Sequence, residues 1–207
     1  MALFDTTALA RIETAVSEAE RGTAGELVVV SVPRSDAYHD VRLAYGVALA
    51  LGGTAVVHAL VPWLEFWWLL WLQAGLIMLA FFALDVAPVL RVLVPRARRQ
   101  SSVLRRAQLE FVEHRVFDTR DRTGVLILLS ELEHKVIMLG DAGIYAQLHQ
   151  DGFQAHVDRI VAAIRGGRAT DGVCEVIGDL GKLLSARFPA KADDVNELSD
   201  SVRQEEH

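Results

Sequence analysis

Three residues of types suited to binding a metal ion or a phosphate stand at the ends of predicted β-strands. Glu26 begins the first apolar run, Arg122 lies just ahead of the second, and Asp141 directly follows the third. Carboxylate oxygens are the ligands that Ca²⁺ and Mg²⁺ prefer, and a guanidinium group binds phosphate through two parallel hydrogen bonds. Glu26 and Asp141 are therefore candidate metal ligands, and Arg122 is a candidate phosphate-binding residue.

A metal held by these carboxylates could act as a Lewis acid in phosphate-ester hydrolysis, with Arg122 holding the phosphate. Gly140 and Gly143 would let the backbone approach an ion or a phosphate closely. A structural alternative stays open, in which Asp141 caps the helix that follows it and Glu26 pairs with Arg122. No motif decides between the two, because the sequence contains no P-loop, GxSxG, HExxH or GxGxxG pattern.

The three apolar runs predict how these residues come together. The runs are ELVVVSV (26–32), GVLILLS (124–130) and HKVIMLG (134–140). A long connection separates the first two, which favours a parallel pair, and three residues separate the last two, which favours an antiparallel hairpin. The start of each parallel strand and the end of the third strand then share one sheet edge.

Helical patterns surround these strands. Apolar residues recur every three or four positions over 9–19, 153–164 and 173–184, and a long helix is predicted from Arg96 to about Asp118. The predicted fold class is α/β, with a small three- or four-stranded mixed sheet, helices on both faces, and a two-helix transmembrane hairpin that interrupts the domain. The lone cysteine, Cys174, lies among apolar neighbours, so a core position is expected.

The hairpin is predicted from a long apolar block. Val41–Val61 and Phe66–Leu84 are each close to the roughly 20 residues that cross a bilayer, and the only formally charged residues in the block are Arg42 and Glu65. A buried core hairpin of a soluble protein is the alternative. The chain is accordingly divided into a first domain part (1–40), a transmembrane hairpin (41–85), a second domain part with a basic juxtamembrane segment (86–189) and a loose acidic tail (190–207).

Aromatic and basic residues indicate where the block meets the headgroups. Tryptophans gather at the turn between the spans, as in an interfacial aromatic belt, and arginines follow the second span. The basic residues place both chain ends on the cytoplasmic side by the positive-inside rule, and anionic lipid should attract them. The predicted membrane-interface residues are Trp63, Trp67, Trp68, Arg91, Arg96, Arg98 and Arg99.

Three stretches together resemble a TPM domain, also called TPM phosphatase. They are TAGELVVVSVPRSDAY, RTGVLILLSELEHKVIMLGDAGI and GRATDGVCEVIGDLGKLLSARFP. The chain is most similar to the bacterial branch in which a transmembrane hairpin interrupts the domain, and its VNELSD segment resembles that branch's ending. The resemblance covers nearly the whole chain, although soluble TPM relatives carry more carboxylates at their acidic site than can be matched here.

The resemblance implies two functions. The first is an adaptor, assembly or quality-control factor for a membrane complex, without strong catalysis, and the alternative is a Ca²⁺- or Mg²⁺-dependent acid-phosphatase-like enzyme. It further implies a location in the bacterial inner membrane and a LemA-type membrane-protein partner. A net charge of −6 argues against nucleic acid as a partner.

Overall fold

The computed structural model describes residues 3–147, 150–190, 198 and 202–204. The chain divides into two compact units. The first contains Met1–Ser35 and Gln100–His207, and the second contains Asp36–Arg99. The second unit includes the whole of the predicted hairpin, 41–85.

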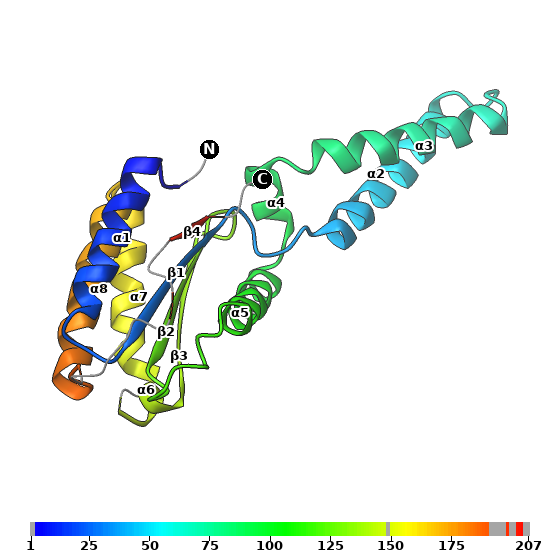
Figure 1. The fold of residues 1–207 in the computed structure, drawn as a ribbon. Helices are drawn as coiled ribbons and strands as arrows, with labels where there is room; N and C mark the ends of the chain where they lie inside the picture. Colours follow the sequence, from blue (N-terminus) through cyan, green and yellow to red (C-terminus); the bar gives the residue numbers. More distant parts are fainter. Residues whose placement is uncertain (1–2, 148–149, 191–197, 199–201, 205–207) are drawn as a thin grey trace. The chain divides into compact units, whose positions relative to one another are not determined.

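A mixed β-sheet forms the centre of the first unit (Figure 1). Its strand order is β3-β2-β1-β4, with β1 parallel to β2 and to β4, and β3 antiparallel to β2. The predicted parallel pair and the predicted β-hairpin are both confirmed. The strands are β1 (Glu26–Val32), β2 (Gly124–Ser130), β3 (Lys135–Gly140) and the two-residue β4 (Arg203–Gln204).

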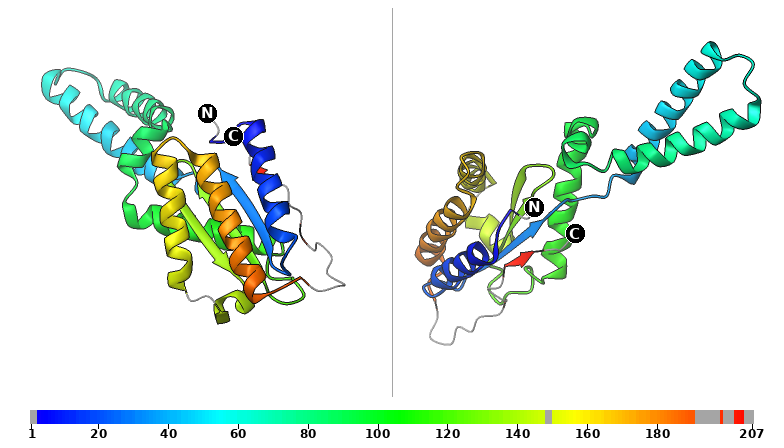
Figure 2. Two further views of the ribbon diagram at one scale, coloured as in Figure 1. Left: turned by 90° about the vertical axis from the view of Figure 1, so that its left-hand side faces the viewer. Right: turned by 90° about the horizontal axis from the view of Figure 1, so that it is seen from above.

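Helices cover both faces of this sheet, as the sequence predicted. Helices α1 (Thr6–Glu20), α7 (Gln150–Arg165) and α8 (Ala169–Arg187) lie side by side on one face (Figure 2), and α5 (Arg96–Glu113) lies on the other (Figure 1). The short helix α6 (Ala142–Gln147) follows β3.

Successive residues of β1 point to opposite faces of the sheet and so enter two separate cores. Leu27 packs into the core beneath α1, α7 and α8, whereas Val28 packs against Val103 and Ala107 of α5. Both faces of β1 and β2 are buried, which explains why these strands are apolar without alternation. At the start of α1, Asp5 caps the helix by accepting a 2.7 Å hydrogen bond from the N–H of Ala8.

The second unit contains two long apolar helices, a short third one and the first residues of α5. The three helices are α2 (His39–Leu60), α3 (Phe66–Ala83) and α4 (Ala87–Leu93). By length and composition, α2 and α3 could each cross a membrane. Few of their residues are buried, unlike those of a core helix in a soluble protein.

Helices α2 and α3 pack through small residues. The buried positions of α2 recur every fourth residue and are Arg42, Gly46, Ala50 and Thr54. A Cβ atom built at Gly46 would lie 3.5 Å from the Cβ of Ala80, the buried residue of α3. Such stripes of small residues let helix backbones approach closely inside lipid.

The C-terminal segment differs from the loose tail that the sequence predicted. Val202 is buried, and its N–H donates a 3.1 Å hydrogen bond to Glu13 on α1. The next two residues form β4 beside β1. The expectation of a loose tail is therefore wrong at 202–204, and most of the acidic stretch lies outside the described residues.

Candidate functional site

Asp141 lies where β3 ends and α6 begins. Its backbone N–H donates a 2.8 Å hydrogen bond to the carbonyl of Gly124, which ties it to the start of β2. Its side-chain Oδ1 accepts a 2.7 Å hydrogen bond from the N–H of Ala142. The carboxylate therefore lies at the start of α6, and the residue is only 7% exposed. The bond reaches the first helical residue and not the second or third, which a capping side chain contacts.

Arg122 reaches the same point from the preceding loop. Its Nη1 lies 3.6 Å from Oδ1 of Asp141 and 3.4 Å from the carbonyl oxygen of Phe117. The Arg122 side chain is 60% exposed, so this ion pair contributes little to stability. An exposed guanidinium beside a carboxylate remains accessible to an anionic group in solution.

Glu26 lies on the other side of β2 from Asp141. It is opposite Gly124 in the strand register, and its N–H donates a 3.3 Å hydrogen bond to the carbonyl of Thr123. Glu26 is 8% exposed. By strand alternation, Glu26 and Asp141 share the sheet face that packs on α5. The structure thus brings the two predicted metal ligands to the same sheet edge, one on each side of Gly124.

The loop 116–123 presses against this edge, and two glycines allow it to do so. A Cβ atom at Gly124 would lie 2.1 Å from the carbonyl oxygen of Val116, and one at Gly143 would lie 2.6 Å from the carbonyl oxygen of Arg122. Gly140 instead faces the side chains of Ile144 and Phe153 on α6 and α7.

These contacts correct the role that the sequence predicted for Gly140 and Gly143. We expected them to admit an ion or a phosphate, but each one accommodates the protein's own packing. The N–H of Gly143 also donates a 3.0 Å hydrogen bond to the carbonyl of Arg122, which leaves that N–H committed to the loop.

The carboxylate oxygens of Glu26 and Asp141 are of the type that binds hard cations such as Ca²⁺. They would supply only part of the cation's coordination shell. The Oδ2 atom of Asp141 is buried and has no hydrogen-bond partner among the described residues. Glu26 and Asp141 would provide two of the six to eight oxygen ligands that Ca²⁺ takes, with carbonyls and water as the remaining donors. In the described part of the chain, no group of three or more His, Cys, Asp or Glu side chains could hold a metal.

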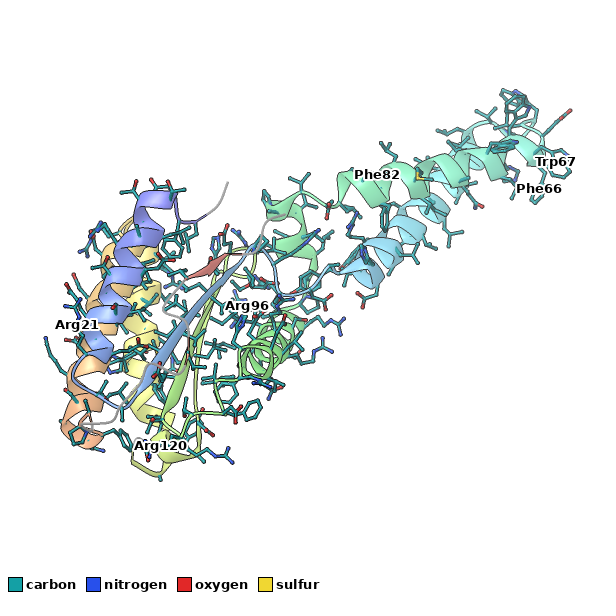
Figure 3. All side chains as sticks on the ribbon, in the orientation of Figure 1. Arg21, Phe66, Trp67, Phe82, Arg96 and Arg120 are labelled. Carbon is teal, nitrogen blue, oxygen red and sulfur yellow. The ribbon has the colours of Figure 1, made fainter. Side chains whose placement is uncertain are left out.

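The predicted interface residues all belong to the second unit. Trp63, Trp67 and Trp68 are strongly exposed near the turn between α2 and α3, and Figure 3 shows Phe66 and Trp67 at that turn, with Phe82 near the opposite end of α3. The predicted arginines lie in α4 and at the start of α5. They are Arg91, Arg96, Arg98 and Arg99.

One of these arginines closes the base of the hairpin. Arg98 forms ion pairs with Asp36 at 3.5 Å and with Asp40 at 3.2 Å. The residues that lead into α2 are therefore bound to the residues that follow α4. This pairing was not predicted, because a cluster of arginines after an apolar span indicates contact with lipid headgroups and does not specify an acidic partner.

Sequence reasoning also missed the role of Arg42. Its guanidinium donates two hydrogen bonds to the carbonyl oxygen of Phe81, at 3.1 Å from Nε and 2.7 Å from Nη2. It lies 3.0 Å from Asp85 and 4.0 Å from the centre of the Phe81 ring. The signal was visible in the sequence, since Arg42 is the one basic residue of the first span and Asp85 directly follows the second.

A buried carboxylate at the opposite sheet edge was missed as well. Glu133 is 3% exposed and accepts hydrogen bonds from the hydroxyl of Ser35 at 2.6 Å and from the hydroxyl of Ser130. It joins the exit of β1 to the β2–β3 turn. Sequence spacing gave no indication of this, because the residue stands in a short turn between two strands, where an exposed glutamate is usual.

Cys174 is half-buried and packs against the edge of the core, so it is less buried than the core position that the sequence predicted. Its Sγ lies 3.8 Å from the carbonyl oxygen of Arg11 on α1. Burial raises the pKa of the Cys174 thiol. A raised pKa disfavours the thiolate, which is the nucleophilic form, so the site does not favour covalent catalysis.

Comparisons with known proteins address the fold. No protein-family model matches the sequence, and no curated protein matches it. The chain is similar to the NMR structure of the BA42 protein from the psychrophilic bacteria Bizionia argentinensis, with a TM-score of 0.61 and 18% sequence identity. The match covers 98% of this chain and 95% of that one. At this identity the likeness concerns the fold alone. The chain itself is a mixed α/β protein with two helices apolar enough to cross a membrane.

Proposed function

We propose that this chain is a membrane-anchored TPM-domain protein that acts as an adaptor, assembly or quality-control factor for a membrane complex. The observation that carries the proposal is the hairpin inserted between β1 and β2, whose large apolar side chains are exposed along both helices. Exposed apolar surface on this scale marks contact with a membrane or another protein. An anchor placed inside the domain suits a protein that works beside the bilayer.

The arrangement of charge supports a bacterial inner-membrane location with both termini in the cytoplasm. Tryptophans lie in the turn between α2 and α3 and in the first turn of α3, and the turn contains no basic residue, whereas arginines gather at the other ends of both helices. That distribution follows the positive-inside rule and the aromatic belt. The LemA-type partner remains a proposal that rests on the TPM resemblance.

Cross-linking in intact cells tests the adaptor function. The full chain should be recovered with one membrane protein in a fixed ratio, and the same chain with an unrelated two-span hairpin is the matched control. Recovery of the partner with the full chain and its depletion with the exchanged hairpin would support an adaptor that recognises its partner inside the membrane. Recovery of the full chain as a lone monomer from native membranes would contradict the proposal.

The second candidate function is metal-dependent hydrolysis of phosphate esters. One observation favours it, namely the buried Asp141 carboxylate, whose Oδ2 lacks a partner among the described residues and whose other oxygen lies 3.6 Å from Arg122. If Ca²⁺ or Mg²⁺ is bound, it would supply a Lewis acid at Glu26 and Asp141. Arg122 would then orient the phosphate through its exposed guanidinium.

Hydrolysis of p-nitrophenyl phosphate in detergent, with and without Ca²⁺ or Mg²⁺, distinguishes the two functions. A metal-dependent rate that Asp141→Asn abolishes would support the phosphatase. Activity that survives Asp141→Asn would remove this site from the reaction. The absence of both activity and a thermal shift with metal would leave the adaptor as the function.

A further inference from the structure

The outer face of α5 carries apolar side chains that the fold does not cover. Leu104, Leu109 and Val112 are 40%, 54% and 60% exposed. On the opposite side of the same helix, Val103 and Ala107 are fully buried against the sheet. The helix therefore has two apolar faces, and the sheet occupies one of them.

Basic residues accompany the uncovered face. Arg105 directly follows Leu104 and stands four residues before Leu109, so its side chain lies on the same side of the helix as both. No acidic residue occurs from Val86 to Leu109. The next acid, Glu110, is buried on the sheet side, where Arg106 lies 2.6 Å from one carboxylate oxygen and His114 lies 2.9 Å from the other.

This combination matches a helix that lies in the headgroup region of a bilayer. Interfacial helices place Leu and Phe at the acyl boundary and Arg or Lys among the phosphates, and an arginine stem can cover apolar surface while its head stays in water. Phe117, four residues beyond the end of the helix, adds further exposed apolar surface.

We propose that the outer face of α5, defined by Leu104, Arg105, Leu109 and Val112, docks onto an anionic lipid surface. Two observations favour lipid over a second copy of the chain. Only twelve residues, 84–95, separate the end of α3 from the start of α5, so the connection keeps the start of α5 close to the proposed membrane. The acid-free basic stretch complements anionic headgroups. The inference rests on the proposed membrane anchoring and adds a second, peripheral contact.

Fluorescent labels read by lipid quenchers test the contact in the full-length protein. Single cysteines in a Cys174→Ser background would carry an environment-sensitive dye at Val112, at Leu79 on α3, or at Asp158 on α7. The proteins are placed in nanodiscs of phosphatidylcholine alone or mixed with phosphatidylglycerol, with a spin-labelled lipid as quencher. We expect quenching at position 79 in both lipids, at position 112 mainly with phosphatidylglycerol, and at position 158 in neither.

The labels at positions 79 and 112 distinguish failure of the α5 contact from failure of the membrane anchoring on which it rests. Quenching at 79 without quenching at 112 would overturn the α5 contact and leave the anchor intact, whereas no quenching at 79 would overturn the anchor. Equal quenching at 112 in both lipids would contradict the requirement for anionic lipid. Efficient cross-linking of two chains through position 112 would show that a second copy covers the face instead.

A charge variant tests whether the basic side chain contributes. One arginine near an anionic surface favours binding by about 1 kcal/mol, or about fivefold in the equilibrium constant. Arg105→Gln should therefore lower the ratio of quenched to unquenched label at position 112 about fivefold. The matched control is Arg165→Gln on the exposed end of α7, which should leave the ratio unchanged, and equal effects of the two variants would refute a local role for Arg105.

Discussion

Replacing Arg42 by glutamine should destabilise the packing of α2 on α3. The Arg42 guanidinium, on a residue only 4% exposed, makes two hydrogen bonds to the carbonyl of Phe81 and covers the Phe81 ring. That carbonyl lies in the last turn of α3, where no backbone donor continues the helix. Glutamine is shorter, cannot donate the same pair of hydrogen bonds to this carbonyl, and carries no positive charge.

The size of the effect follows from these contacts. A hydrogen bond from a charged donor contributes about 1.5–3 kcal/mol, and the guanidinium on the ring adds about 0.5–1 kcal/mol. The ion pair to Asp85 adds less than about 1 kcal/mol, since that carboxylate is 41% exposed. We therefore expect Arg42→Gln to cost about 3 kcal/mol, and Asp85→Asn to cost less than about 1 kcal/mol.

Titration of the detergent-solubilised protein with sodium dodecyl sulfate provides the measurement. All four tryptophans lie between Trp63 and Trp71, so their emission reports on the hairpin, and far-ultraviolet circular dichroism reports on the whole chain. Arg165→Gln, at an exposed position, is the matched control and should have no effect. An Asp85→Asn variant as destabilised as Arg42→Gln would refute the reasoning, because the ion pair rather than the carbonyl cap would then hold the hairpin.

Three further predictions concern the α/β domain. Gly124→Ala should cost about 3 kcal/mol or more, since its Cβ would meet the carbonyl of Val116 at 2.1 Å, whereas Gly178→Ala, with no atom in the way, should be neutral or stabilising in urea unfolding. Burial lowers the pKa of His156, so the unfolded chain binds a proton at this residue more tightly than the folded chain does. The melting temperature should therefore fall as the pH drops through about 6.5, and His156→Gln should weaken that decline. Ile127→Ala should cost about 2–5 kcal/mol in the same unfolding assay, because Ile127 is fully buried.

Much of the fold could be predicted because β1 and β2 have simple physical signatures. An uninterrupted run of β-branched residues such as Val28–Val30 indicates a strand buried on both faces, and the structure buries every residue of β1. The long connection to β2 then favours a parallel pair, which the structure confirms. The same strand pairing predicts that Glu26 and Asp141 lie at one sheet edge, and the structure places both beside Gly124.

The remaining features depend on contacts that no periodicity encodes. The approach of Val116 to Gly124 arises from a loop that folds back on β2, and sequence spacing does not specify loop paths. The addition of Arg203–Gln204 to β1 is a long-range pairing by a segment with a polar composition. The two hydrogen bonds from Arg42 require α2 and α3 to be packed in one register, which their uniform apolarity does not reveal.

The most direct test of membrane anchoring is the sidedness of the hairpin turn. Single cysteines at Glu65, in the turn, and at Lys182, on exposed α8 surface, would be introduced into the Cys174→Ser chain and treated with a membrane-impermeant maleimide in sealed vesicles of known orientation. The proposed anchoring predicts that the reagent labels position 65 from one side only and position 182 from the other. Labelling of both positions from the same side would contradict it.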